Sequence, residues 1–153
     1  MRFAVDAHAI GRHLTGNEVY VRSLLNAIGA HDRDCEFIAY VSAEEARSHV
    51  PSRIRTRRIA RNPFLRLGFD LCRKVREDRP DLLHVQYTAP LGCPVPVVVT
   101  VHDVSFLEHP EYFKRGRAWQ LQQTVSRTVK RAAKILTGTE YARSSILKVY
   151  GEV

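Results

Sequence analysis

Long hydrophobic runs and paired cysteines are missing from this sequence of 153 residues. No apolar stretch approaches the roughly 20 residues that a helix needs to span a bilayer. The start of the chain, Met1-Arg2, leads directly into a short strand pattern and not into the apolar segment of a signal peptide. The three cysteines, Cys35, Cys72 and Cys93, lie far apart without a CxxC pair, which excludes a disulfide framework and a zinc ribbon. We therefore expect a cytoplasmic protein with reduced thiols.

Metal-ligand spacings are missing as well. None of the seven histidines pairs with another histidine or a cysteine at a recognised ligand spacing, so we expect no bound metal. Hydrophobic residues make up 44% of the chain and charged residues 26%, which is typical of a globular protein and excludes a disordered one. We expect residues 1–153 to form one domain.

Positive charge is in surplus, with a net charge of +8, and arginines cluster between Arg53 and Arg76. Two interpretations stay open: a solvated surface, or a patch that binds a phosphorylated substrate or an anionic membrane. No aromatic residues are interleaved with the arginines as stacking platforms, and no helix-turn-helix or zinc-finger pattern is present. We therefore expect no nucleic-acid partner.

Strand and helix patterns alternate along the whole chain. Short apolar runs predict strands at 2–6, 36–41, 54–59, 81–85, 97–101 and 134–138. Helical spacing predicts helices at about 17–29, 65–79 and 114–133, and from 139 onward. Ser42 is expected to cap a short helical piece, and Trp119 to anchor the packing of its helix. The alternation predicts a doubly wound, mainly parallel α/β sheet of the Rossmann-like kind.

The strand at 97–101 is the centre of this pattern, because its valines suit a strand that is covered on both faces. His102 and Asp103 follow where the apolar run ends. In open α/β sheets, ligands bind beyond the carboxyl ends of the strands. An imidazole beside a carboxylate at such an edge can donate, accept and titrate near neutral pH. The alternative is that His102 only caps the strand and Asp103 only begins the loop.

Three other positions carry polar groups at element ends. Tyr87 follows the strand at 81–85. Gly16 and Asn17 stand between the first strand and the first helix, an arrangement that points backbone N–H groups at an anion. Asn17 alternatively serves only as the helix N-cap, and Thr139 is a natural N-cap of the last helix.

These residues together resemble a known family. The segments that carry the resemblance are 15–25 with Thr15-Gly16-Asn17-Glu18, 96–103 with Thr-Val-His-Asp at its end, and 136–143 with Thr-Gly-Thr-Glu-Tyr-Ala-Arg. They look like the N-terminal half of a family 4 glycosyltransferase with the two-domain GT-B fold. The early segment differs from the family's Thr-Gly-x-Gly-Arg-Tyr because it lacks the second glycine and the arginine.

The resemblance implies a retaining enzyme that transfers a sugar from a nucleotide sugar to an acceptor, in glycan or cell-surface polysaccharide biosynthesis. It implies no metal and no cofactor besides the nucleotide-sugar donor. His102 would approach the transferred sugar while Asp103 shapes the loop. The substrate-binding candidates are Gly16, Asn17, Tyr87, Thr139 and Arg143. The resemblance also implies that the C-terminal, nucleotide-sugar-binding domain is absent from this chain, which would then be inactive alone.

Two further hypotheses stay open. The chain is alternatively a stand-alone α/β module that binds a phosphorylated small molecule at the loop before Asn17. The second hypothesis concerns location: the basic residues near the predicted helix at 65–79 would attach the protein weakly to anionic lipids at the inner face of the plasma membrane, near a lipid-linked acceptor. The apolar residues of that helix are alternatively buried against the sheet.

Overall fold

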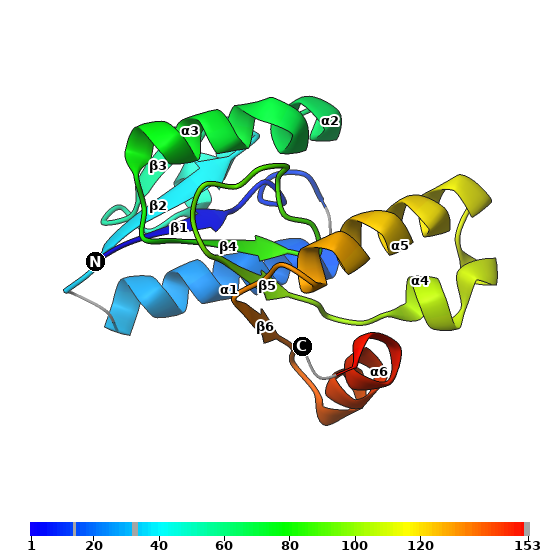
Figure 1. The fold of residues 1–153 in the computed structure, drawn as a ribbon. Coiled ribbons are helices and arrows are strands. Elements are labelled where there is room, and N and C mark those ends of the chain that lie inside the picture. The colour runs from blue at the N-terminus through cyan, green and yellow to red at the C-terminus, as the bar shows by residue number, and fades with distance from the viewer. Residues whose placement is uncertain (14, 32–33, 152–153) are drawn as a thin grey trace. The chain divides into compact units, whose positions relative to one another are not determined.

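A computed structural model describes residues 1–13, 15–31 and 34–151, in which strands and helices alternate as predicted (Figure 1). The elements in chain order are β1 (Arg2–Asp6), α1 (Thr15–His31), β2 (Glu36–Val41), η1 (Glu45–His49), β3 (Arg55–Arg58), α2 (Pro63–Leu65), η2 (Arg66–Asp70), α3 (Leu71–Asp78), β4 (Leu82–Gln86), β5 (Val97–Thr100), α4 (Ser105–Glu108), η3 (Pro110–Tyr112), α5 (Arg115–Val129), β6 (Lys134–Leu136) and α6 (Glu140–Tyr150).

The strand order is β3-β2-β1-β4-β5-β6, and β1 pairs in parallel with both β2 and β4. The chain runs outward from β1 through β2 to β3 and then returns to the other side of β1 with β4. This order is that of a doubly wound sheet, and β1 and β4 flank its switch point. The predicted α/β fold class is confirmed.

The chain divides into two compact units. The first comprises Met1–His84 with Pro90–Pro96, and the second comprises Val85–Ala89 with residues 97–153.

In the first unit, α1 and α3 lie on opposite faces of the strands (Figure 1). Val21 and Leu25 of α1 are fully buried in a core cluster with Val5 and Val41. Their spacing of four residues places them on one face of the helix, as the sequence pattern predicted. The strand predicted at 54–59 is confirmed as β3, which pairs in parallel with β2 and lies at the edge of the sheet.

The predicted helix at 65–79 is confirmed, with a single turn of π-helix, η2, between α2 and α3. It ends at Arg79, whose φ of 49° is left-handed, directly before Pro80. Burial of its apolar residues, one of the two interpretations, is confirmed for part of the segment only. Leu71 and Val75 are fully buried, whereas Leu65 and Phe69 are 54% and 59% exposed.

In the second unit, β5 and β6 pair in parallel, and Val99 is fully buried. Thr139 caps α6 as predicted, since its side-chain oxygen accepts a hydrogen bond from Ala142 N at 3.1 Å. The prediction for Trp119 is wrong, because its side chain is 65% exposed. The buried apolar residues of α5 are spaced seven and four positions apart, at Ala118, Val125 and Val129. Position 119 does not lie on that face of the helix.

Two local predictions in the first unit are also wrong. Ser42 caps no helix: η1 begins at Glu45, and the Ser42 hydroxyl donates to the His8 carbonyl at 2.8 Å. Asn17 is not an N-cap, because α1 already begins at Thr15 and Asn17 lies in its first turn. Among the described residues, no helix combines the length and the apolar character needed to cross a membrane.

Candidate functional site

His102 lies directly beyond the carboxyl end of β5, in the second unit, and its ring is held on two sides. Its Nε2 is 2.9 Å from Gln86 Oε1, and its ring meets the edge of the Tyr87 ring at a centroid distance of 5.6 Å. An amide oxygen only accepts, so Nε2 carries the proton in this pair. Burial lowers the pKa of His102. The negative charge of Asp103 raises this pKa, but by less, so the pKa stays below its ordinary value. The imidazole is therefore neutral and oriented at neutral pH.

Asp103 closes the turn that follows His102. Its carboxylate accepts from the Tyr87 hydroxyl at 2.9 Å, and from the backbone N and hydroxyl of Ser105 at 2.9 and 2.5 Å. Burial raises the pKa of Asp103, but hydrogen bonds from Ser105 and Tyr87 outweigh burial and leave the pKa lowered. Tyr87 has a left-handed φ of 58°, a conformation that non-glycine residues rarely adopt outside functional sites and tight turns. The carboxylate is thus ionised and fixes a strained turn beside the imidazole.

A second polar cluster lies beyond the carboxyl end of β1, in the first unit. Asp6 is 1% exposed, and its Oδ2 accepts from Arg66 Nη1 at 2.5 Å. Its Oδ1 is 3.1 Å from His8 Nδ1 and also accepts from the His8 backbone N at 3.2 Å. Burial raises the pKa of Asp6, but the charges of Arg66 and His8 outweigh burial and hold it well below the usual range. Asp6 therefore stays a carboxylate inside the protein.

Arg66 reaches this cluster from the π-helical turn η2 and is itself only 5% exposed. Its Nε makes no hydrogen bond to the residues that the structure describes. Single π turns inside helices often occur at functional sites. A buried ion pair is weak evidence for stability on its own, because desolvation of the two charges offsets much of their attraction. The cluster is therefore a candidate for function as well as for structure.

The first turn of α1 contains Gly16 and Asn17. Gly16 is exposed, with open space where a side chain would be. The carboxylate of Glu18 accepts from the Gly11 backbone N at 3.0 Å. The backbone N–H of Gly11 is thus already bonded to a negative charge. The hypothesis of a phosphate-binding module at this loop stays a prediction.

Thr139 and Arg143 lie at the start of α6. The Thr139 side chain caps the helix, and Arg143 Nη1 pairs with Glu140 Oε1 at 2.7 Å. Arg143 also lines a hollow of about 410 Å³ together with Ile135 and Leu136. An exposed guanidinium at the rim of an apolar hollow suits a ligand with both polar and apolar parts.

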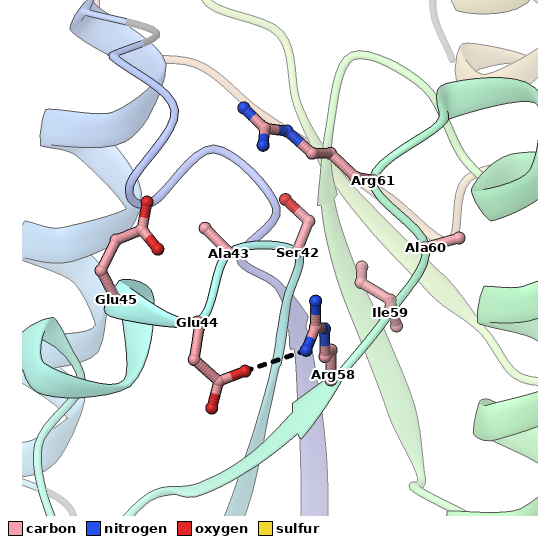
Figure 2. A pocket seen from close by; sticks show the side chains of 8 residues that line it. All are labelled: Ser42, Ala43, Glu44, Glu45, Arg58, Ile59, Ala60 and Arg61. Atoms are coloured by element: carbon pink, nitrogen blue, oxygen red, sulfur yellow. Dashed lines mark hydrogen bonds and ion pairs between the residues drawn. The ribbon is translucent and has the colours of Figure 1, made fainter.

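A pocket of about 320 Å³ lies beyond the carboxyl ends of β2 and β3 (Figure 2). Arg58 and Arg61 line one side of it, and Glu44 and Glu45 line the other. Arg58 Nη1 and Glu44 Oε2 form an ion pair at 3.0 Å. Charges of both signs around one small pocket can donate to and accept from the hydroxyl groups of a sugar.

Comparison with known families decides what kind of protein this is. The sequence model of Glycosyltransferase Family 4 matches residues 14–153. The chain belongs to glycosyltransferase family 4. The predicted resemblance is thereby confirmed, as the N-terminal domain of a glycosyltransferase with one half of a GT-B fold. Among the curated proteins searched, none matches the chain.

The predicted site residues of this family 4 glycosyltransferase fall into both units. Tyr87, His102 and Asp103 form one connected cluster. Thr139 and Arg143 belong to the same unit, whereas Gly16 and Asn17 belong to the other. The roles assigned to all these residues stay predictions.

Sequence reasoning missed Asp6, His8 and Arg66. The sequence signal for the first two is a carboxylate and an imidazole, separated by Ala7, at the end of a buried strand. No local signal marks Arg66, which is 60 residues from Asp6. Among the described residues, no group of three histidine, cysteine or acidic side chains gathers as a metal site requires. Catalysis without a metal or other cofactor stays a prediction.

Proposed function

We propose that this chain is the acceptor-side domain of a retaining glycosyltransferase that transfers a sugar from a nucleotide sugar to a glycan or lipid-linked acceptor. The observation that carries the proposal is the cluster of Tyr87, His102 and Asp103 at the carboxyl end of β5, in a family 4 chain. The pathway that suits this activity is glycan or cell-surface polysaccharide biosynthesis.

Sugar transfer requires that the charge of the leaving phosphate be stabilised while the acceptor hydroxyl is held close to the anomeric carbon. His102 contributes a neutral, oriented imidazole that hydrogen-bonds a hydroxyl of the transferred sugar. Asp103 acts as a positioning residue through Tyr87, which contacts both His102 and Asp103. A separate C-terminal domain holds the nucleotide, and neither a metal nor another cofactor takes part.

The isolated chain is expected to fold but not to transfer sugar, because it provides only the acceptor side of the cleft. The test compares the chain with the full-length enzyme, using a panel of UDP-, GDP- and dTDP-sugars as donors and alkyl glycosides as acceptors. Full-length enzyme should release nucleoside diphosphate in an acceptor-dependent way, and the chain should stay at background. Equal rates for the two proteins would contradict the division of labour between domains. Anomeric analysis of the product tests retention.

We also propose that the enzyme associates weakly with anionic membranes at the cytoplasmic face. Many of the basic residues that indicated membrane binding form ion pairs within the protein, which weakens their attraction to anionic lipids. These pairs are Arg57 with Glu77 and Asp78, Arg58 with Glu44, Arg73 with Asp70 and Glu77, and Lys74 with Asp70. The stronger support for membrane association therefore comes from exposed apolar side chains. Phe64, Leu65 and Phe69 are 77%, 54% and 59% exposed, with the exposed Arg61 close by in the sequence. Exposed aromatic and aliphatic groups beside cations favour a lipid interface.

Replacement of Phe64 and Phe69 by serine is expected to reduce binding to anionic vesicles several-fold, because it removes the exposed apolar groups. Co-sedimentation with phosphatidylglycerol and phosphatidylcholine vesicles at low and high salt measures this. Tyr112→Ser is the matched control, since Tyr112 is 76% exposed but belongs to the other unit. The proposal fails if the chain binds both vesicle types equally at low salt or binds neither.

A further inference from the structure

The pocket of Figure 2 is formed within the first unit by residues that follow two neighbouring strands. Residues 42–45 come directly after β2, and residues 58–61 end β3 and the loop beyond it. Ligands of doubly wound sheets bind beyond the carboxyl ends of the strands. We propose that this pocket binds one neutral sugar ring of the acceptor, so that the acceptor is itself a glycan or a glycoside; this inference rests on the proposed glycosyltransferase function.

The size and the floor of the pocket suit a single sugar ring. Its volume of about 320 Å³ is at the lower end of the range of roughly 300–1,000 Å³ that small-molecule pockets occupy. Buried Ala43 and Ile59 supply apolar atoms to its lining, and charged side chains stand around them (Figure 2). A sugar ring has C–H groups on its faces and hydroxyl groups at its rim. The lining therefore matches both parts of such a ring.

Two of the four charged side chains are available to a ligand. Arg58 and Glu44 pair with each other at 3.0 Å. The guanidinium of Arg61 and the carboxylate of Glu45 form no ion pair with any residue that the structure describes. A guanidinium only donates hydrogen bonds and a carboxylate only accepts them, whereas a hydroxyl group does both. Sugar hydroxyls can thus accept from Arg61 and donate to Glu45.

The balance of charge in the pocket determines which class of sugar it favours. Two arginines and two glutamates line it, so their formal charges cancel. A carboxylate or a phosphate on the ligand would be attracted by Arg61 but repelled by Glu45, and an amine would meet the reverse. A neutral hydroxyl meets neither repulsion. The pocket therefore favours a neutral sugar over an acidic or phosphorylated one.

The loop that carries Arg61 is held in place by its backbone. The Ala60 N–H donates to Asp70 Oδ2 at 2.7 Å, and the Arg61 carbonyl accepts from Arg12 Nη1 at 3.3 Å. These bonds leave the guanidinium of Arg61 free of the task of holding its own loop. Binding then orders one side chain and not a whole loop, which lowers the entropic cost of association.

The opposite wall, which carries Glu45, is packed against the loop after β1. Gly11 of that loop has a left-handed φ of 73°. A Cβ at this position would lie only 3.1 Å from Ala43 Cβ and 3.1 Å from Glu45 Cγ, closer than ordinary van der Waals contact. Glycine is therefore needed for this close approach. Both walls of the pocket are thus built before a ligand binds.

The test varies two residues of opposite charge in the full-length enzyme, Arg61→Met and Glu45→Ala. Arg22→Met is the matched control, because Arg22 is exposed on α1 and does not line the pocket. The acceptors are the alkyl glycosides of the panel, in solution without vesicles and with saturating nucleotide sugar. We expect the acceptor KM to rise by about 10-fold in each pocket variant, because each loses a hydrogen bond that involves a charged group.

The other quantities should stay constant. The kcat, the donor KM and the thermal transition of both pocket variants should match the wild type, since the lost contact contributes to binding alone. Calorimetric titration of the donor-free enzyme with the same glycoside should show the same loss of affinity without turnover. The affinity of the wild type should change little between low and high salt, because the ligand carries no charge.

The signs of the two effects separate the ligand classes. An anionic ligand would bind more weakly to Arg61→Met but more tightly to Glu45→Ala, and that pair of results would overturn the inference. An acceptor KM unchanged in both variants would overturn it as well, while leaving the proposed function intact. Failure of the wild-type enzyme to transfer sugar from any donor of the panel would instead contradict the proposed function itself.

Discussion

Replacement of Arg66 by methionine is expected to lower the free energy of unfolding by about 3–5 kcal/mol, because it leaves the buried Asp6 carboxylate without its cation. Both side chains are almost fully buried, at 6% and 1% exposure, so water cannot replace the lost partner. For a domain of this size, the transition temperature should fall by roughly 10 °C. Urea unfolding of the isolated chain measures the loss directly.

A matched control for Arg66→Met is Arg61→Met, which removes an exposed guanidinium a few residues away and should change stability by less than about 0.5 kcal/mol. The double variant Asp6→Asn with Arg66→Met should recover part of the loss, since no charge is then buried. Equal stability of Arg66→Met and the wild type would contradict the burial of this pair.

The same pair predicts a pH dependence of stability. Arg66 and His8 lower the pKa of Asp6 in the folded state below its unfolded value of about 3.9. A carboxyl group shifted in this direction stabilises the fold above its unfolded pKa, and this contribution disappears as the pH falls through the two values. The wild-type chain should therefore lose stability below about pH 4, and Arg66→Met should lose less over the same range. Parallel curves for the two proteins would contradict the assignment to Asp6.

Turnover of the full-length enzyme is expected to fall by about 10²- to 10³-fold in His102→Ala, with an almost unchanged thermal transition. The size of the effect follows from losing one oriented hydrogen-bonding group at a reacting centre. Stability should change little because the ring is only half-buried. Steady-state kinetics and thermal unfolding of the same preparations measure the two quantities.

The matched control for His102→Ala is His109→Ala, which removes an exposed imidazole from the same unit and should leave turnover unchanged. Asp103→Asn separates charge from shape: if Asp103 acts by holding the turn, the amide should retain much of the activity. Loss of stability in His102→Ala with normal turnover per folded molecule would establish the alternative, that His102 only caps β5.

Local features were readable from the sequence because they depend on neighbours along the chain. The bounds of β1 and β2 follow from short apolar runs, and the cap at Thr139 follows from one side chain and the first turn of its own helix. The same holds for His102, since the buried strand 97–101 predicts a carboxyl end at that position. The sequence by itself therefore determined the fold class, the family and one of the two polar clusters.

Two kinds of feature were decided only by the tertiary structure. The first is contacts that depend on the order of the strands, and the second is the exposure of apolar side chains, which depends on which face of a helix is covered. The ion pair between Asp6 and Arg66 joins residues 60 positions apart, and it forms because the turn at η2 places Arg66 beside the end of β1. Phe69 and Trp119 have the hydrophobicity of core residues, yet each lies off the buried face of its helix. Periodicity identifies an apolar residue, but the packing of elements distant in sequence determines whether that residue meets protein or water.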